Sequence, residues 1–121
     1  MPEPEPEGPP TVIAFEVDHG CPSVLVDRSP GARPVSHLDP AELGLSPRLT
    51  RGLAEWLARW ERAASWGVTH HLDEPDPDWL EPERGALRRE RPGLAHQVQN
   101  ELGAGVEVLL DGRPVREHRG A

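Results

Sequence analysis

The chain has 121 residues, of which 36% are hydrophobic, and a formal net charge of −8. This length suits one domain with a single modest core. The negative charge argues against nucleic-acid binding, because an acidic chain repels the phosphate backbone. No signal-peptide pattern opens the chain and no run of about 18 apolar residues occurs, so we expect no membrane span. Cys21 is the only cysteine and fits a reducing compartment, so we expect a cytoplasmic protein.

The first ten residues read MPEPEPEGPP. Alternating proline and glutamate supply little apolar surface and few backbone donors, which predicts an extended, solvated acidic tail over residues 1–10. We expect residues 11–115 to form a single domain. The charged and small residues 116–121 are expected to be a frayed end.

Two short strands are predicted near the start of that domain. In residues 11–18, Ile13, Phe15 and Val17 alternate with other residues, as in a half-buried strand. A turn at HGCP then leads to a second run, Val24 to Val26, and the two runs predict a hairpin. After a turn-rich stretch at 28–36, Asp39-Pro40 predicts one helical turn over residues 39–43.

Two amphipathic helices follow. The first begins at the Ser46-Pro47 cap and ends near Trp66-Gly67, with apolar residues at three- and four-residue intervals. The second runs from about Pro82 to Leu102, and Pro92-Gly93 predicts a kink or a division into two shorter helices. A long loop, residues 68–81, joins them.

The chain closes with a strand containing Val106, Val108 and Leu110, a hairpin turn at Asp111-Gly112, and an edge strand containing Pro114. The element order β-β-α-α-β(-β) predicts an α+β fold, a small antiparallel sheet packed on one face by two helices.

Asp18, His19 and Cys21 form the first candidate site, a thiolate beside an imidazole or half of a metal site. A nucleophile also needs a nearby base and an oxyanion pocket, and zinc needs about four ligands. The alternative is a hairpin corner in which a small cysteine packs inward.

His70 and His71 precede several acidic residues and form a candidate metal site. Their spacing matches neither HExxH nor an EF-hand loop. A solvated acidic loop is the simpler interpretation, and we expect no cofactor.

Residues 73–83 contain six carboxylates and no basic residue, with an aromatic residue among them. The acids and the aromatic residue are Asp73, Glu74, Asp76, Asp78, Trp79, Glu81 and Glu83. An aromatic anchor inside an acidic rim is typical of an interface for a basic partner. The alternative is that Trp79 only pins the loop onto the helices.

Four segments carry a resemblance: EVDHGC (16–21), LDPAELGLSPRLTRGLAEWLARWE (38–61), DEPDPDW (73–79) and NELGAGVEV (100–108). They resemble a small uncharacterised actinobacterial family with a Gly-Cys strand end, a DPxxLxLS lead into a Trp-bearing helix and a closing Glu-Leu-Gly helix end. Aromatic residues follow Gly-Cys in that family, whereas Pro22, Ser23 and Val24 follow here. The shared motifs are helix leads and caps, so the resemblance implies a fold rather than an activity.

The sequence favours a non-enzymatic protein-interaction module, such as an immunity-type or antitoxin-like inhibitor of a basic partner. GxSxG, P-loop and GxGxxG patterns are absent, which lowers the expectation of the commonest enzymes. Two alternatives stay open: a small hydrolase or transferase that uses Cys21 with a histidine, and a metal-binding accessory domain that uses His70 and His71.

Overall fold

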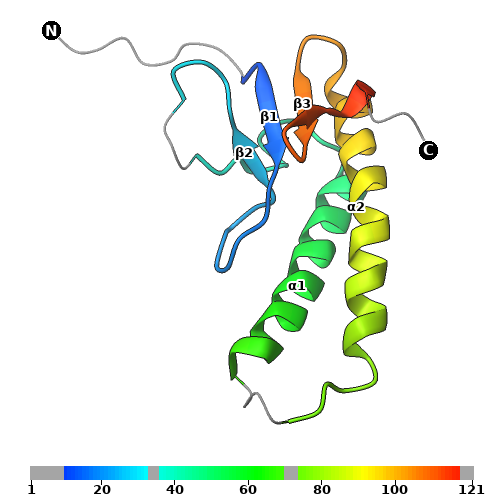
Figure 1. The fold of residues 1–121 in the computed structure, drawn as a ribbon. Helices are drawn as coiled ribbons and strands as arrows, with labels where there is room; N and C mark the ends of the chain where they lie inside the picture. The colour runs from blue at the N-terminus through cyan, green and yellow to red at the C-terminus, as the bar shows by residue number, and fades with distance from the viewer. Residues whose placement is uncertain (1–9, 33–35, 70–73, 118–121) are drawn as a thin grey trace, which may run out of the picture.

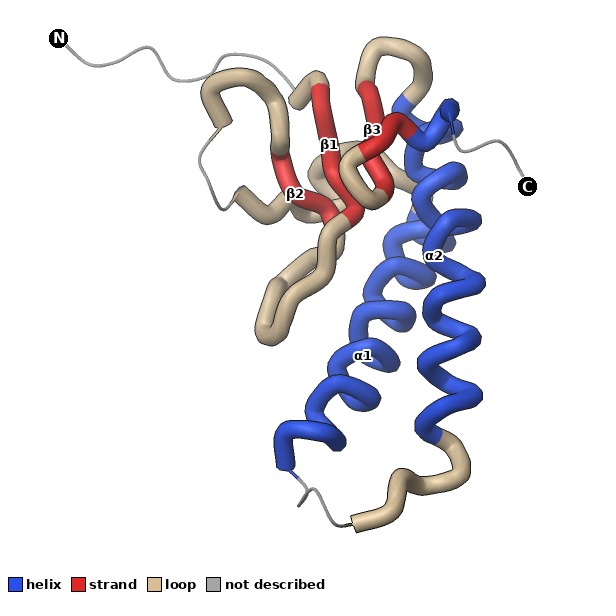
Figure 2. Tube along the Cα trace, in the orientation of Figure 1, coloured by secondary structure: helices blue, strands red, loops and turns tan. Residues whose placement is uncertain are grey.

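The computed structural model describes residues 10–32, 36–69 and 74–117. Two long helices, α1 (Pro47–Thr69) and α2 (Leu80–Leu102), form a hairpin, and a small sheet lies at one end of it (Figure 1). The strands gather at the end where α1 begins and α2 finishes, as Figure 2 shows. The predicted α+β class and element order are confirmed. Neither described helix combines the length and apolar character needed to cross a bilayer.

The sheet contains β1 (Val12–Phe15), β2 (Leu25–Asp27), β3 (Glu107–Leu110) and β4 (Arg113–Pro114), in the order β2-β1-β3-β4. β1 and β2 form the predicted antiparallel hairpin. β1 and β3 are parallel, with Ile13 opposite Val108, so the sheet is mixed and the expectation of antiparallel pairing throughout is corrected. The helical hairpin explains why β3 runs parallel to β1. α2 returns the chain to the edge of the sheet at which β1 starts, so β3 starts there as well.

The alternation read from the sequence places one face of the sheet in the core. Ile13 and Phe15 of β1, and Val108 and Leu110 of β3, belong to the buried cluster that the helices complete. The helices contribute Leu49, Leu53, Trp56, Ala63, Leu80, Leu87, Ala95 and Val98. Burying these side chains is the main favourable contribution to folding.

The connection from β2 to α1 contains the predicted turn at residues 39–43. The Asp39 carboxylate accepts a hydrogen bond of 2.9 Å from the Ala41 N–H, and the Leu43 N–H donates to the Asp39 carbonyl at 3.2 Å. The aspartate thus caps the turn that its position before proline predicts.

α1 begins as predicted and ends later. The Ser46 hydroxyl accepts the Leu49 N–H at 3.2 Å, which makes Ser46 the N-cap and places Pro47 at the first helical position. The helix continues past Gly67 to Thr69. A single glycine costs a helix only about 1 kcal/mol relative to alanine, so Gly67 alone does not end it.

α2 begins at Leu80, so Pro82 lies in the first turn, where a missing N–H costs nothing. The helix runs through Pro92 to Leu102 as one element, which excludes the predicted alternative of two shorter helices. At its end Gly103 has a φ of 79° and its N–H donates to the Gln99 carbonyl. Glycine suits this position because it adopts positive φ without strain.

The chain ends in a tight turn and an edge strand. Asp111 and Gly112 have φ values of 54° and 77°, as a two-residue hairpin turn requires, and Pro114 lies in the edge strand β4. A short 3-10 turn, η1 (Val115–Glu117), buries Val115. Residues 116 and 117, expected in the frayed end, belong to this turn, and residues 118–121 lie outside the described residues.

The N-cap of α1 is also bonded to the end of α2. The Ser46 N–H and hydroxyl donate to the two Glu101 carboxylate oxygens at 2.6 and 2.7 Å. These bonds, chiefly the one from the backbone, hold the pKa of Glu101 below its ordinary value. A group with a lowered folded pKa stabilises the fold above its unfolded pKa, near 4.3, and stops doing so as the pH falls through the folded value.

We therefore expect Ser46→Ala to lower the free energy of unfolding by about 1 kcal/mol at neutral pH, the usual loss for an N-cap. The part of this loss that comes from the hydrogen bond to Glu101 should disappear in acid, where Glu101 is protonated in both proteins. Urea denaturation at neutral and acidic pH measures both parts, and Glu101→Gln serves as the control because it keeps the capping hydroxyl. An unchanged urea midpoint for Ser46→Ala would contradict the capping role.

Candidate functional site

The Asp18, His19 and Cys21 corner lies in the connection between β1 and β2. Cys21 is only 8% exposed, and its N–H donates to the Asp18 carbonyl at 3.3 Å. The His19 ring tilts against Trp60 of α1, with 5.2 Å between ring centroids. Among the described residues no hydrogen bond joins the Cys21 thiol to a histidine. The geometry therefore adds no support to a thiolate mechanism, and the Cys/His hypothesis stays a prediction.

The second candidate site falls largely in the part of the chain that is not described. His70, His71 and Asp73 lie outside the described residues. Within residues 10–32, 36–69 and 74–117, no three histidine, cysteine, aspartate or glutamate side chains gather as a metal site would require. The metal hypothesis stays a prediction.

The acidic cluster divides into two parts at the end of the hairpin that lies away from the sheet (Figure 1). Glu74, Asp76 and Asp78 lie in the loop before α2 and are exposed, whereas Glu81 and Glu83 lie in the first turn of α2. We call Glu74, Asp76 and Asp78 the tip carboxylates. No ion pair within 4.0 Å joins a tip carboxylate to another described residue.

Trp79 is half-buried at the N-cap position of α2 and packs against the core cluster. The guanidinium carbon of Arg62 lies 4.4 Å from the centroid of its ring. A cation over an aromatic face is favourable by about 0.5–1 kcal/mol at an exposed site. The ring is thus held from α1 and remains partly exposed beside the tip carboxylates.

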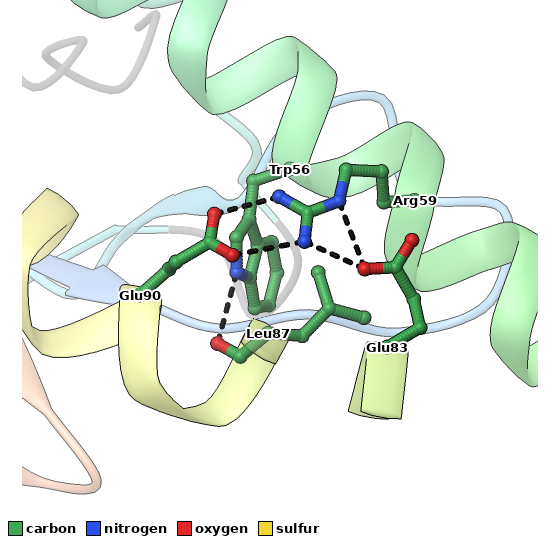
Figure 3. A network of polar contacts seen from close by, with 5 residues as sticks. All are labelled: Trp56, Arg59, Glu83, Leu87 and Glu90. Carbon is green, nitrogen blue, oxygen red and sulfur yellow. Dashed lines mark hydrogen bonds and ion pairs between the residues drawn. The ribbon is translucent and has the colours of Figure 1, made fainter. Parts of the chain in front are cut away.

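Arg59 of α1 binds two carboxylates of α2 (Figure 3). Its guanidinium donates to Glu83 at 2.6 Å and to both oxygens of Glu90 at 2.6 and 2.8 Å. These hydrogen bonds hold the pKa values of Glu83 and Glu90 below the ordinary glutamate value, against a smaller opposing effect of desolvation. Glu83 therefore joins the two helices together, a role that the sequence did not indicate.

Glu81 also has basic neighbours. Its carboxylate lies 3.6 Å from Arg88 and 3.9 Å from Arg84 on the same helix. The 73–83 segment contains no base, but the helical fold brings arginines from α1 and from later in α2 beside it. The tip carboxylates remain as the part of the predicted acidic surface without such neighbours among the described residues.

A cleft of about 530 Å³ lies between α1, α2 and the connection that follows β1, and the sequence did not lead us to expect it. Its lining includes Val17, Trp60, Ala64, Arg84, Arg88 and Arg91. The three arginines are spaced four and three residues apart, so they lie along one face of α2. That spacing is the one sign in the sequence of a basic face on this helix. We call the cleft the arginine cleft.

No protein-family model, curated protein or solved structure matches this chain. The resemblance drawn from the sequence motifs therefore stays a prediction. The functional argument rests on the tip carboxylates, Trp79 and the arginine cleft.

Proposed function

We propose that this chain is a non-enzymatic protein-interaction module, of the immunity or antitoxin-like kind, that binds a basic protein through the tip carboxylates. One observation carries the proposal: Glu74, Asp76 and Asp78 are exposed, lie together in the loop that leads to the half-buried Trp79, and form no ion pair with a described residue. Glu83 and Glu90, by contrast, are paired with Arg59. Within the described part of the chain, no basic side chain competes with another molecule for the tip carboxylates.

Trp79 supplies the apolar part of this surface. It is half-buried and held by Arg62, so little side-chain entropy is lost when a partner covers the rest of its ring. Tryptophan is enriched among the residues that dominate binding energy, while surrounding charges mainly raise the association rate and select the partner. The proposal places the module in the cytoplasm, where the lone Cys21 would stay reduced.

The test neutralises the tip carboxylates with Glu74→Gln, Asp76→Asn and Asp78→Asn in the full chain. The control carries the same loss of charge at three exposed glutamates elsewhere: Glu42→Gln, Glu107→Gln and Glu117→Gln. Each protein is immobilised and used to capture partners from a lysate of its native host, and the captured protein is then purified for rate measurements. We expect a basic partner whose association rate falls about tenfold or more with the tip variant and much less with the control.

Salt supplies a second measurement. Association driven by opposite charges slows as ionic strength rises, because exposed charges are screened beyond about 10 Å at 0.1 M salt. The wild-type rate should therefore fall with added salt, and the tip variant should show a flatter dependence. An acidic partner, or one that binds the tip variant as fast as wild type, would overturn the proposal.

A further inference from the structure

The arginine cleft carries positive charge on a chain whose net charge is −8. Arg84, Arg88 and Arg91 line one side of it, spaced over about 10 Å of α2 at a rise of 1.5 Å per residue. Val17 and Trp60 line it as well, from the connection after β1 and from α1. Its volume, about 530 Å³, falls within the usual range for a ligand site.

The fold uses these arginines unequally. Arg91 is held by Asp111, with its guanidinium nitrogen 2.6 Å from both carboxylate oxygens. Arg88 is 69% exposed, and Glu81, with which it forms an ion pair at 3.6 Å, is itself exposed. Exposed ion pairs of this kind contribute little to stability, so Arg84 and Arg88 retain donors for another molecule.

The apolar side of the cleft is preformed. Trp60 is half-buried, packs against the core cluster and is contacted by the His19 ring. Val17 and Ala64 extend this surface. A ligand that carries carboxylates as well as an apolar side chain would therefore meet guanidinium donors and an aromatic face within the same cleft.

We propose that the arginine cleft binds an extended acidic segment of a partner protein, with acidic residues at alternate positions and apolar residues between them. Charge complementarity selects the acidic residues, and arginine pairs with carboxylates through two parallel hydrogen bonds. Arg84 and Arg88 lie about 6 Å apart along the helix, and alternate residues of an extended chain are about 6.6 Å apart on one face. Carboxylates at alternate positions thus match these two arginines.

This proposal is independent of the tip carboxylates, since it concerns a different surface and a partner of opposite charge. The net charge of −8 opposes any acidic ligand, and it opposes a nucleic acid more than the proposed segment, because every nucleotide carries a phosphate whereas only alternate residues of the segment are charged. Glu81 and Asp111 beside the arginines would repel a continuous row of phosphates in the same way. Isolated carboxylates separated by apolar residues avoid that repulsion.

The test uses a fluorescein-labelled peptide in which glutamates alternate with leucine and phenylalanine, titrated with the full chain and followed by fluorescence anisotropy. The matched peptide has the same composition with its glutamates gathered in one block. We expect saturable binding of the alternating peptide and weaker binding of the blocked one. In the protein, Arg84→Gln with Arg88→Gln should weaken binding about tenfold or more.

Arg48→Gln with Arg51→Gln is the matched control, because both residues are exposed on α1 and neither lines the cleft. Its affinity should stay within about twofold of wild type, since surface charges outside a site act only through screened fields. Absent binding, equal binding by both peptides, or equal loss in both double variants would overturn the proposal. So would tighter binding of a labelled single-stranded oligonucleotide at the same arginines.

The chain's own first residues are the remaining competitor for the cleft, because Glu3, Glu5 and Glu7 also alternate with other residues. The titration is therefore repeated with Glu3→Gln, Glu5→Gln and Glu7→Gln in the full chain. An unchanged affinity supports a partner in trans. If the peptide bound only to this variant, the cleft would be assigned to residues 3–7 of the same chain, and the proposal of a partner protein would be overturned.

Discussion

Replacing Trp56 by alanine is expected to lower the free energy of unfolding by about 3–5 kcal/mol, the usual cost of truncating a buried aromatic residue. Trp56 is 3% exposed and lies edge-on to Phe15 of β1, with ring centroids 5.3 Å apart. Its indole N–H donates to the Leu87 carbonyl of α2 at 3.0 Å (Figure 3). This one side chain of α1 thus contacts both the sheet and α2, so its loss should weaken the packing of α1 against each of them.

Urea denaturation followed by far-ultraviolet circular dichroism measures this effect without using tryptophan fluorescence, which the substitution itself changes. Trp56→Phe is the matched control, because it keeps an aromatic ring and loses the hydrogen bond, whose net contribution is about 1 kcal/mol. Phenylalanine should therefore give an intermediate stability. An alanine variant within about 1 kcal/mol of wild type would contradict the central position of Trp56 in the core.

The elements that could be predicted from the sequence are those specified by neighbouring residues. Ser46 and Pro47 mark the start of α1, alternation marks β1 and β3, and the Asp111-Gly112 pair marks a two-residue turn. Each of these signals depends only on residues close together in the sequence, so contacts made elsewhere in the fold do not change it. The predicted end of α1 and start of α2 differ by about two residues from the observed ones, because the helices accommodate Gly67 and Pro82 where these residues lie.

The features that the sequence did not reveal depend on residues far apart in the chain. The parallel pairing of β1 with β3 follows from the route through both helices, which local patterns do not encode. Arg59 and Glu83 are 24 residues apart and meet only because the helices form a hairpin. The charges within residues 73–83 therefore do not reveal that Glu81 and Glu83 have arginine neighbours from other parts of the chain.

The hairpin separates opposite charges on one small molecule. The tip carboxylates lie before α2, and the arginines of the cleft follow along that same helix. Such a layout suits a protein that contacts a basic surface and an acidic segment at different places. The two proposed surfaces use different residues, so each set of variants tests one surface and leaves the other intact.

Replacing Gln99 by methionine, a side chain of similar length, is expected to lower the free energy of unfolding by about 3 kcal/mol. Gln99 is 7% exposed, and its amide nitrogen donates to the Gly103 and Val106 carbonyls at 2.9 and 2.7 Å. Its amide oxygen accepts the Val108 N–H at 2.9 Å, which attaches β3 to the end of α2. Methionine removes these three hydrogen bonds, each worth about 1 kcal/mol net, although Arg116 still donates to the Gly103 and Val106 carbonyls at 3.5 and 3.0 Å.

Gln99→Glu separates the hydrogen bonds from the packing. Its carboxylate could still accept the Val108 N–H, but it would face two carbonyl oxygens. Burial and this repulsion should raise its folded pKa above the ordinary value near 4.3, against an opposing attraction from Arg116, which donates to the same two carbonyls. A raised folded pKa means that the stabilising contribution is complete below the unfolded pKa and is lost as the pH rises through the folded value. The variant should therefore be much less stable than wild type at neutral pH and recover toward it in acid, where the protonated carboxyl donates. Urea midpoints of both proteins across this pH range measure the difference, and a gap that stays constant with pH would mean that Gln99 does not donate to these carbonyls.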